Sequence, residues 1–398
     1  MRILVASPFL PHPAAEHGGA VYLGTVVEAL ARRAEVTLAC LAPPEPEPIP
    51  PAPRGLTRLV AIRHAHLHDL RGAQRAQHKA KMLREWARPA RPAMAAKFWS
   101  PELANRLAAL VNEIQPDVAL VEFAVMAQYL PALAPTATVL TDHECGAPLP
   151  IAIGPAGLGR RRDARQWTHY LERHYADAAL VQTLTEEDAA LLASRLGRPV
   201  EVRPAVIPLP DRVAAPDRAP PRALFLGNFR HDPNTDAAVR IATQIWPAVH
   251  ARLPDARLHI VGHHPPAAVR ALATRPGVAV LGAVPDLTTA LGDVRLLLAP
   301  LYAGAGVRIK TLTALAHGLP VVCNALGARG IDAPAPALTR AETAAALGEA
   351  TCALLADPAR AATAGAAARQ WAEQTRSPDA MAAQQLDRFA ALLRTHDT

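Results

Sequence analysis

Short apolar runs alternate along this chain with longer segments whose apolar residues recur every three or four positions. The first apolar run is Arg2–Ser7 (RILVAS), and the second is Glu35–Leu41. Between them, residues 20–33 place several apolar side chains on one face of a helix: Val21, Val26, Val27 and Leu30. A strand, a helix and a second strand in this order predict the βαβ start of a doubly wound α/β domain.

The same order appears again after the middle of the chain. Ala223–Leu226 is an apolar run, a turn begins at Gly227, and Asn234 or Thr235 has the side chain of an N-terminal cap for the next helix. Two more apolar runs follow, at Leu258–Val261 and Val278–Leu281. We therefore expect an α/β protein of two doubly wound, Rossmann-like domains that face one another across a central cleft.

The boundary between these domains is predicted from proline content. Residues 207–221 contain five prolines and show no hydrophobic periodicity, which is typical of a linker. The first domain is then expected to cover residues 1–206 and the second residues 222–377.

One stretch of the second half, Val294–Gly330, combines structural and chemical signals. Leu296–Leu298 predicts a buried strand, a glycine turn follows it, and a helix is expected from Arg308 to His317 with Gly318 as its left-handed C-terminal residue. A glycine turn at a helix start presents unpaired backbone N–H groups, which favour a phosphate. Arg308 and Lys310 add two charges that suit a diphosphate. The alternative is a tight turn with two solvated cations, and we favour the phosphate site.

The segment PLYAGAGVRIKTLTALAHGLPVV resembles the donor-site signature of retaining glycosyltransferases of family 4, which have the GT-B fold. Members use a nucleotide-diphospho-sugar as co-substrate and need no metal or other cofactor. The resemblance implies that the last helix, residues 378–398, crosses back to the first domain. It also implies a donor site in the second domain, made of Gly227, Asn228, Arg230, Val284, Gly304, Ala305, Gly306, Val307, Leu312 and Thr313, with Arg308 and Lys310 on the diphosphate.

One position departs from the family pattern. The family usually has a glutamate where this chain has Thr313, and that glutamate accepts hydrogen bonds from the donor ribose. A threonine hydroxyl is a weaker acceptor than a carboxylate. The substitution leaves a second hypothesis open, that of a catalytically degenerate GT-B protein that serves as a nucleotide-binding or scaffold subunit.

The resemblance assigns the acceptor to the first domain. Gly18 and Gly19 match family glycines that lie across the cleft from the donor phosphates. Glu122 ends a predicted strand, where it either contacts an acceptor hydroxyl or pairs with a nearby arginine, and we leave both open. The polar run Asp142-His143-Glu144 ends another strand. A salt-bridged strand end is the alternative there, but we favour an acceptor site that includes His143 in the catalytic set.

Charge and composition limit the partners. The net charge is +7, and nine of the Arg and Lys residues lie between residues 58 and 91. We interpret this basic segment, 54–97, first as a solvated face near the cleft, second as a contact with an anionic membrane, and last as a nucleic-acid site, which we do not expect. The four cysteines form no metal-ligand spacing, and no apolar run reaches membrane-spanning length. We expect a bacterial cytoplasmic protein, with peripheral contact at the inner membrane face as an option.

These signals predict a retaining, metal-independent hexosyltransferase in glycoconjugate, polysaccharide or secondary-metabolite biosynthesis. No side-chain nucleophile is evident, in agreement with the family mechanism, in which the donor diphosphate itself helps to deprotonate the acceptor hydroxyl. Arg308, Lys310 and the glycine N–H groups would stabilise the charge of the leaving diphosphate. A GT-B-like epimerase or phosphorylase is a further alternative.

Overall fold

The computed structural model describes residues 1–12, 18–44, 49, 51–66, 69–143, 158–304 and 306–396. Two predicted site residues, Glu144 and Ala305, lie outside the described residues. Contacts divide the chain into two compact units. Unit 1 comprises Met1–Pro13, Leu23–Pro204 and Asp379–Thr398, and unit 2 comprises Ala14–Tyr22 and Ala205–Pro378.

Unit 1 is built on a parallel sheet of seven strands in the order β3-β2-β1-β4-β5-β6-β7. The strands are β1 (Arg2–Ser7), β2 (Glu35–Ala42), β3 (Arg58–Arg63), β4 (Val118–Glu122), β5 (Ala137–Asp142), β6 (Leu180–Thr183) and β7 (Glu201–Val202). The register pairs Val5 of β1 with Leu38 and Leu120 on its two neighbours. The central strands are buried along nearly their whole length, which explains why they read as continuous apolar runs.

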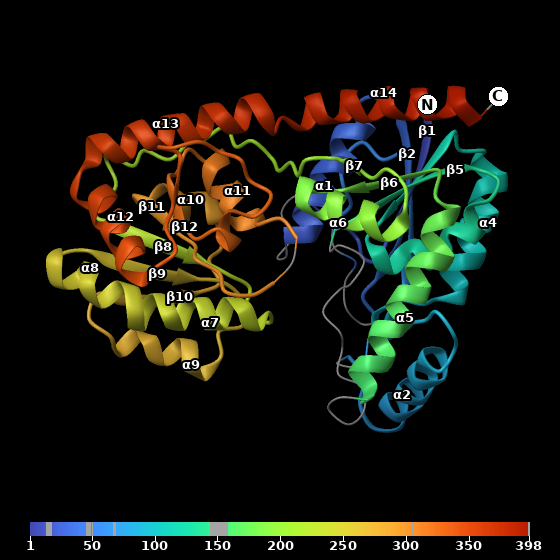
Figure 1. Cartoon of the computed structure of the whole chain (residues 1–398), viewed down its shortest axis with the longest axis horizontal. Coiled ribbons are helices and arrows are strands. Elements are labelled where there is room, and N and C mark those ends of the chain that lie inside the picture. Colours follow the sequence, from blue (N-terminus) through green and yellow to red (C-terminus); the bar gives the residue numbers. More distant parts are fainter. Residues whose placement is uncertain are drawn as a thin grey trace. The chain divides into compact units, whose positions relative to one another are not determined.

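The helices of unit 1 follow the strands in a doubly wound pattern. They are α1 (Gly18–Ala31, whose residues up to Tyr22 belong to unit 2), α2 (Gly72–Trp86), α3 (Ala93–Lys97), α4 (Pro101–Ile114), α5 (Leu158–His174), α6 (Glu186–Leu196) and α14 (Pro378–His396), with 3₁₀ segments η1 (Ala124–Leu133) and η2 (Tyr175–Asp177). Figure 1 shows α2 near the first residues of the long helix α5. Thr185 caps α6 by accepting a hydrogen bond from the Asp188 N–H, and Gly197 ends it at φ +63°.

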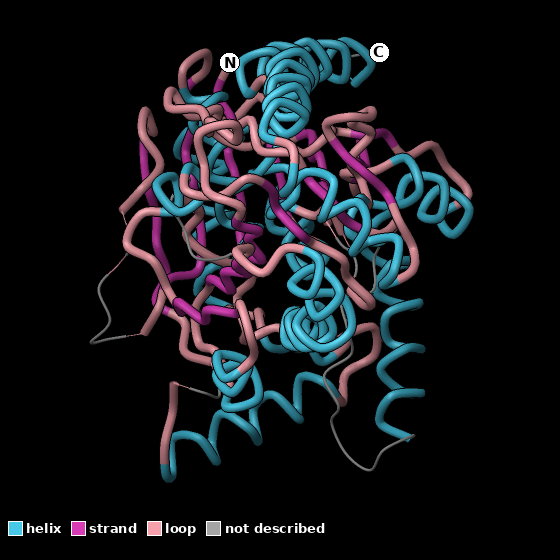
Figure 2. Tube along the Cα trace, turned by 90° about the vertical axis from the view of Figure 1, so that its left-hand side faces the viewer, coloured by secondary structure: helices cyan, strands magenta, loops and turns pink. Residues whose placement is uncertain are grey.

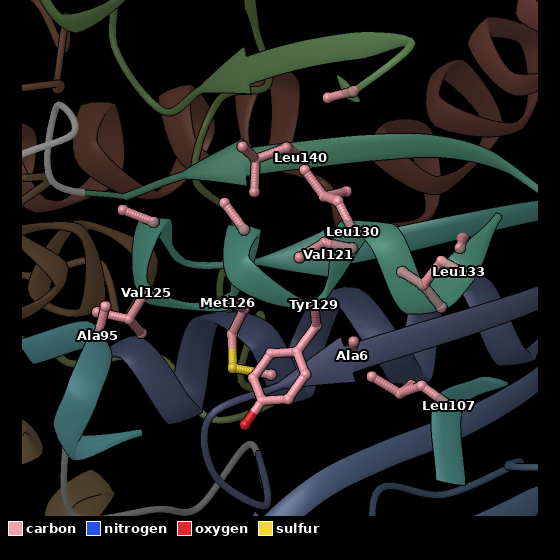
Figure 3. Packing of buried hydrophobic residues seen from close by; sticks show 14 of the residues in the cluster. Ala6, Ala95, Leu107, Val121, Val125, Met126, Tyr129, Leu130, Leu133 and Leu140 are labelled. Atoms are coloured by element: carbon pink, nitrogen blue, oxygen red, sulfur yellow. The ribbon is translucent and has the colours of Figure 1, made fainter. Parts of the chain in front are cut away.

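The core of unit 1 lies between the sheet, η1 and the helices. Figure 3 shows Met126, Tyr129 and Leu133 of η1 gathered with Leu107, Val121 and Leu140, which come from α4, β4 and β5. The Tyr129 hydroxyl accepts from the Ser100 N–H and donates to the Phe98 carbonyl, so its polar end is satisfied inside the core. Helix α14 joins this unit through a buried pair of amides, Gln182 and Gln385.

Our sequence interpretation of the basic segment was incomplete. Its sequence, interrupted by Pro89 and Pro92, indicates one or two helices, but the segment begins with the edge strand β3. Leu59, Val60 and Ala61 of β3 are half-buried, and the exposed Arg58 and Arg63 are its two ends. The apolar run LVAI is therefore short, and the charges beside it obscure the strand.

Unit 2 is built on a parallel sheet of six strands in the order β10-β9-β8-β11-β12-β13. The strands are β8 (Arg222–Leu226), β9 (Arg257–Val261), β10 (Val278–Gly282), β11 (Leu296–Leu298), β12 (Val321–Cys323) and β13 (Leu338–Arg340). Figure 2 shows the strands of the chain in magenta among cyan helices. Strands β8, β9, β10 and β11 lie at the four apolar runs that predict strands in the second half.

Helices cover both faces of the second sheet. They are α7 (Asp232–Arg240), the π-helical turn η3 (Ile241–Ile245), α8 (Trp246–Arg252), α9 (Ala267–Arg270), η4 (Ala271–Thr274), α10 (Leu287–Gly292), α11 (Ile309–Ala316), η5 (Leu326–Ala328), α12 (Ala344–Ala356) and α13 (Pro358–Thr375). Figure 1 shows α7, α8 and α9 on one side of β8–β10, and α11 with α13 on the other. The expected cap at Asn234 or Thr235 is wrong: α7 already begins at Asp232, with Pro233 in its first turn.

Candidate functional site

The strand order of unit 2 marks one edge as a ligand-binding position. From β8 the chain moves to β9 on one side, and from β11 it moves to β12 on the other. The two strands that part in this way, β8 and β11, are hydrogen-bonded neighbours. Open α/β sheets bind ligands at the carboxyl ends of such strands. The loop that begins at Gly227 and the loop that leads to Arg308 both start from this edge.

Glycines allow the loops at this edge to lie unusually close together. A Cβ at Gly262, which has φ +148°, would lie 1.7 Å from the carbonyl oxygen of Gly227. A Cβ at Gly227 would lie 2.9 Å from the Cβ of Asn234. The Phe229 N–H also donates to the His263 carbonyl oxygen at 3.0 Å. The ends of β8 and β9 are therefore in contact through the backbone, and side chains are excluded between them.

Two asparagines connect the β8–α7 loop to the helix α11. Asn228 Oδ1 accepts from the Arg230 N–H at 3.0 Å, and the Asn234 amide donates to the Asn228 carbonyl oxygen at 2.7 Å. The other end of the Asn234 side chain, Oδ1, accepts from Lys310 Nζ at 2.5 Å. The fold thus brings the predicted residues Asn228 and Lys310 close together, and Asn234 is hydrogen-bonded to both.

Lys310 is partly buried. Among the residues that the structure describes, its Nζ makes no ion pair with a carboxylate. Its Nζ lies 4.7 Å from the centroid of the Phe225 ring. Burial, together with the charge of Arg308, lowers the pKa of Lys310 to about 7. A lysine in this state gains charge when an anion approaches, so it is suited to bind a phosphate oxygen.

Arg308 supports the glycine turn from within. It is the N-cap residue of α11, and its side chain is buried. Its Nε donates to the Leu326 carbonyl oxygen at 2.9 Å, and its Nη2 donates to the Gly304 carbonyl oxygen at 2.7 Å. Gly304 and Gly306 have φ values of +112° and +72°, which only glycine adopts readily. Arg308 therefore fixes this turn while adding a positive charge beside it.

Asn324 holds the neighbouring loop in place. Its Oδ1 accepts from the N–H groups of Leu301 and Gly327, and its amide donates to the Leu301 carbonyl oxygen. Thr311 Oγ1 of α11 donates to the Gly327 carbonyl oxygen at 2.8 Å. These bonds join the ends of β11 and β12 to the first turn of α11, so that the turn is rigid before any ligand binds.

The remaining predicted donor residues lie in α11 and in loops of unit 2. The side chain of Leu312 is fully buried, and its N–H donates to the Arg308 carbonyl oxygen, so it belongs to the support of the turn. Thr313 is half-buried in α11, and its carbonyl oxygen accepts from His317. Val284 and Val307 are half-buried in loops, and Arg230 is exposed.

The acceptor-side residues of unit 1 lie at the carboxyl edge of the first sheet, where β1 and β4 are the neighbouring strands that part. Glu122 ends β4 and is fully buried. Its carboxylate accepts two bonds from Arg203 Nη2, at 2.7 and 2.9 Å, and Oε2 lies 2.7 Å from His143 Nε2. Of the two options that we left open for Glu122, the structure shows pairing with an arginine.

Opposing effects act on the Glu122 carboxyl. Burial by itself raises the pKa of Glu122, but the charge of Arg203 and the contact with His143 outweigh burial and lower it. The neighbouring Asp142 is also buried, and its Oδ2 accepts from the Tyr175 hydroxyl at 2.8 Å. Gly18 and Gly19, the first residues of α1, belong to unit 2 and not to unit 1. Of the predicted acceptor-side residues, the structure brings Glu122 and His143 into direct contact.

Sequence reasoning missed three residues of these two edges: Arg203, Asn234 and Asn324. Arg203 follows the two-residue strand β7, and an arginine in a loop is normally interpreted as a solvated side chain. Asn234 we considered only as a helix cap. Asn324 follows β12 directly, and a polar residue at the carboxyl end of a buried strand is the signal that would have pointed to it.

Within the described ranges, no group of three or more His, Cys, Asp or Glu side chains could hold a metal ion. In the same part of the chain, no helix combines the length and apolar character needed to span a membrane.

Comparisons with known proteins agree with the architecture. Residues 220–357 match the family described as "Glycosyl transferases group 1". No curated protein sequence gives a significant match to the chain. Sucrose-phosphate synthase from Thermosynechococcus elongatus is similar in structure, with a TM-score of 0.70 and 18% identity, over 99% of this chain and 100% of that chain.

Two further solved structures are similar at 12% identity. One is an E. coli structure described as trehalose-6-phosphate bound with UDP-2-fluoro glucose, with a TM-score of 0.67 over 98% of this chain and 99% of that chain. The other is Anabaena Alr3699/HepE in complex with UDP and glucose, with a TM-score of 0.64 over 97% and 99% of the two chains. At such low identity these likenesses concern the fold.

Proposed function

Because residues 220–357 of this chain belong to the group 1 glycosyltransferases and the whole chain has the GT-B fold, we propose that it moves a sugar from a nucleotide-diphospho-sugar to a hydroxyl acceptor. Transfer proceeds with retention of anomeric configuration and without a metal ion. The products are glycoconjugates, polysaccharides or secondary metabolites.

One observation supports this proposal most strongly. A glycine turn, a partly buried lysine and a buried arginine occur together at the carboxyl edge between β8 and β11. An oxyanion that develops on a leaving diphosphate is best stabilised by fixed charges and dipoles that need no reorganisation. Lys310 supplies a charge, and Arg308 fixes the glycine turn that precedes α11.

The base of the donor is proposed from the relatives. HepE was solved with UDP and glucose, and the E. coli structure with UDP-2-fluoro glucose. We take UDP as the first nucleotide to test. On the acceptor side, we propose that His143 faces the acceptor hydroxyl, with Glu122 and Asp142 behind it, while the departing diphosphate takes the proton of that hydroxyl.

Calorimetric titration of the full chain with UDP, GDP, ADP and dTDP tests the donor site. We expect one of them to bind, and we expect Arg308→Ala with Lys310→Ala to weaken it at least about 100-fold, since each charged hydrogen bond contributes ~1.5–3 kcal/mol. The matched control replaces two exposed cations of unit 2, Arg252 and Arg275, by alanine. Equal affinity of the site variant and the control would refute the assignment.

A second candidate function is a degenerate, nucleotide-binding GT-B subunit, and Thr313 is the observation that favours it. The two functions differ in turnover. Release of nucleotide diphosphate from any nucleotide-sugar, including transfer to water, supports the transferase. Intact nucleotide binding with complete inertness toward all donors supports the degenerate subunit.

We also propose that the basic segment 54–97 contacts an anionic membrane surface from the cytoplasmic side. On α2 the exposed charged residues are all cationic: Arg75, Lys79, Lys81 and Arg84. The one acidic residue of this helix, Glu85, is buried and paired with Arg88 and Arg91. Leu83 is exposed between these charges. A cationic helix face with an exposed leucine suits the surface of an anionic bilayer.

A further inference from the structure

The side chain of Asn234 connects two helices of unit 2 at the edge where the donor is expected to bind. Asn234 lies near the start of α7, and its Oδ1 accepts from Lys310 Nζ of α11 at 2.5 Å. Its Nδ2 donates to the Asn228 carbonyl oxygen at 2.7 Å. The amide is thus used at both ends, once as an acceptor and once as a donor.

The chemistry of the two partners fixes the orientation of this amide. A backbone carbonyl oxygen only accepts hydrogen bonds, and an ammonium group only donates them. The NH₂ end of Asn234 must therefore face Asn228, and its oxygen must face Lys310. Neither leucine nor aspartate could make both bonds, because leucine has no polar side-chain atom and an ionised carboxylate has no donor.

Packing also restricts the Asn234 side chain. A Cβ placed on Gly227 would lie 2.9 Å from the Asn234 Cβ, 3.0 Å from its Cγ and 3.3 Å from its Oδ1, so the side chain lies directly against the Gly227 backbone. The loop that carries the Asn228 carbonyl is itself closed by a hydrogen bond from the Arg230 N–H to Asn228 Oδ1 at 3.0 Å. The acceptor that Asn234 offers to Lys310 is therefore in position before any ligand binds.

Among the described residues, the side chains in contact with Lys310 Nζ are uncharged. They are the Asn234 amide and the Phe225 ring, whose centroid lies 4.7 Å from Nζ. The charge of Arg308 acts on Lys310 from the same helix end, and it is also positive. The two carboxylates of α7, Asp232 and Asp236, are exposed and make no ion pair with Nζ. The lysine is thus held by a neutral group.

We propose that Asn234 is a positioning residue of the donor site, which holds Lys310 Nζ through a neutral acceptor and leaves its charge available to the donor diphosphate. A carboxylate at the same position would also hold the ammonium, but it would cancel the charge and repel the diphosphate. The inference deepens the proposed transferase function and rests on it. A charge that is held in place in advance stabilises a leaving diphosphate without rearrangement.

The test begins with the ionisation of Lys310 in the full chain without ligand. The chain contains four lysines, Lys79, Lys81, Lys97 and Lys310, so ¹³C-lysine labelling gives few NMR signals. The Lys310 signal is the one that is lost in Lys310→Arg, and its chemical shift is followed from about pH 5 to about pH 11. We expect the lysine of the parent protein to titrate with a pKa of about 7.

Two substitutions should move this pKa in opposite directions. In Asn234→Asp a carboxylate contacts the ammonium and favours its charged form, so the pKa of Lys310 should rise by at least about one pH unit. In Asn234→Leu the hydrogen bond to the ammonium is lost while burial remains, so the pKa should fall below that of the parent. A residue that only stabilised α7 would not move the two values apart. The control Thr235→Asp adds the same charge at the next position of α7 and should change the pKa much less.

Binding is measured by calorimetry on the same proteins, with the nucleotide among UDP, GDP, ADP and dTDP that the parent binds most tightly. At pH 7 we expect Asn234→Asp to bind it at least about tenfold more weakly, because the added carboxylate cancels the charge of Lys310. Its affinity should change little from pH 7 to 9, since the lysine stays protonated. Asn234→Leu should also bind more weakly at pH 7, because less of Lys310 is charged. Thr235→Asp should stay within about threefold of the parent.

Opposite movements of the Lys310 pKa in the two variants, with weaker binding in both, would support the inference. An unchanged Lys310 pKa in a folded Asn234 variant, or parent-like binding by Asn234→Asp at pH 7, would overturn it. Because the expected pKa changes differ in sign, either variant suffices if the other does not fold. Failure of the proposed function looks different: the parent itself would bind no nucleoside diphosphate, while the titration without ligand would still show whether Asn234 controls Lys310.

Discussion

Lys310 Nζ lies 2.5 Å from Oδ1 of Asn234, although the two residues belong to separate helices of unit 2, α11 and α7. The partner of this cation is a neutral amide, and the amide is itself fixed by its bond to the Asn228 carbonyl oxygen. A neutral acceptor orients the ammonium without cancelling its charge. Lys310 is thus held in position for an anion, and its burial lowers its pKa.

Binding of a nucleoside diphosphate should therefore depend on pH. The free protein has a Lys310 pKa of about 7, and a bound diphosphate raises it. Binding then requires proton uptake above pH 7, and affinity should fall by up to about tenfold for each pH unit from 7 to 9. The ligand itself does not change charge in this window, since the last phosphate ionisation lies near about 6.

Calorimetry in buffers of different ionisation enthalpy measures this proton uptake directly. Lys310→Arg is the matched control, because a guanidinium stays charged throughout. We expect its affinity to be nearly flat from pH 7 to 9. A parent protein with equally flat affinity would show that Lys310 does not meet the diphosphate.

The close approach of two loops at Gly262 gives a stability prediction. A methyl group there would lie 1.7 Å from the Gly227 carbonyl oxygen, so Gly262→Ala must push the ends of β8 and β9 apart. We expect a loss of at least about 3 kcal/mol in the free energy of unfolding, together with weaker nucleotide binding.

Gly292→Ala is the control for this substitution. Gly292 ends α10, and nothing lies within 4 Å of its added Cβ. Alanine should there change stability by less than about 1 kcal/mol. Urea unfolding of both variants provides the comparison, and equal losses would show that the Gly262 contact has no special importance.

The elements were predictable wherever local pattern determines structure. Leu296–Leu298 is a strand as predicted, the helix expected from Arg308 to His317 runs from Ile309 to Ala316, and Gly318 has φ +72°. The apolar run, the glycines and the helical spacing are each local signals. The GT-B fold was predicted in the same way, from two βαβ starts and the family resemblance.

The contacts of the site were less predictable, since they join residues far apart in sequence. Glu122 meets Arg203 across 81 positions, and Lys310 meets Asn234 across 76. The residues of β3 were missed for another reason, because an edge strand needs only one apolar face. The sequence thus predicted which sheet edges carry polar residues. Which of these residues contact one another depends on the order of the strands in the sheet, and no local pattern encodes that order.

The cationic face of α2 predicts binding to anionic vesicles. Replacing Lys79, Lys81 and Arg84 by alanine should weaken sedimentation with phosphatidylserine-containing vesicles about 10- to 100-fold, since each cation near the surface contributes ~1 kcal/mol. Neutral vesicles should not sediment the parent protein. The control removes the same charge from exposed positions of unit 2: Arg252, Arg275 and Arg360. If both triple variants lose binding equally, net charge and not α2 is responsible.

Thr313 predicts a gain of function. It lies half-buried in α11, five residues after the N-cap Arg308 and three after Lys310. By resemblance, a carboxylate at this position accepts hydrogen bonds from the donor ribose, and bonds to a charged acceptor contribute ~1.5–3 kcal/mol. Thr313→Glu should therefore bind UDP about tenfold more tightly or better in calorimetry. Thr313→Gln has the same length without the charge and should gain much less. A gain that is equal in both variants would assign the effect to side-chain size, and no gain in either would place the ribose away from this turn of α11.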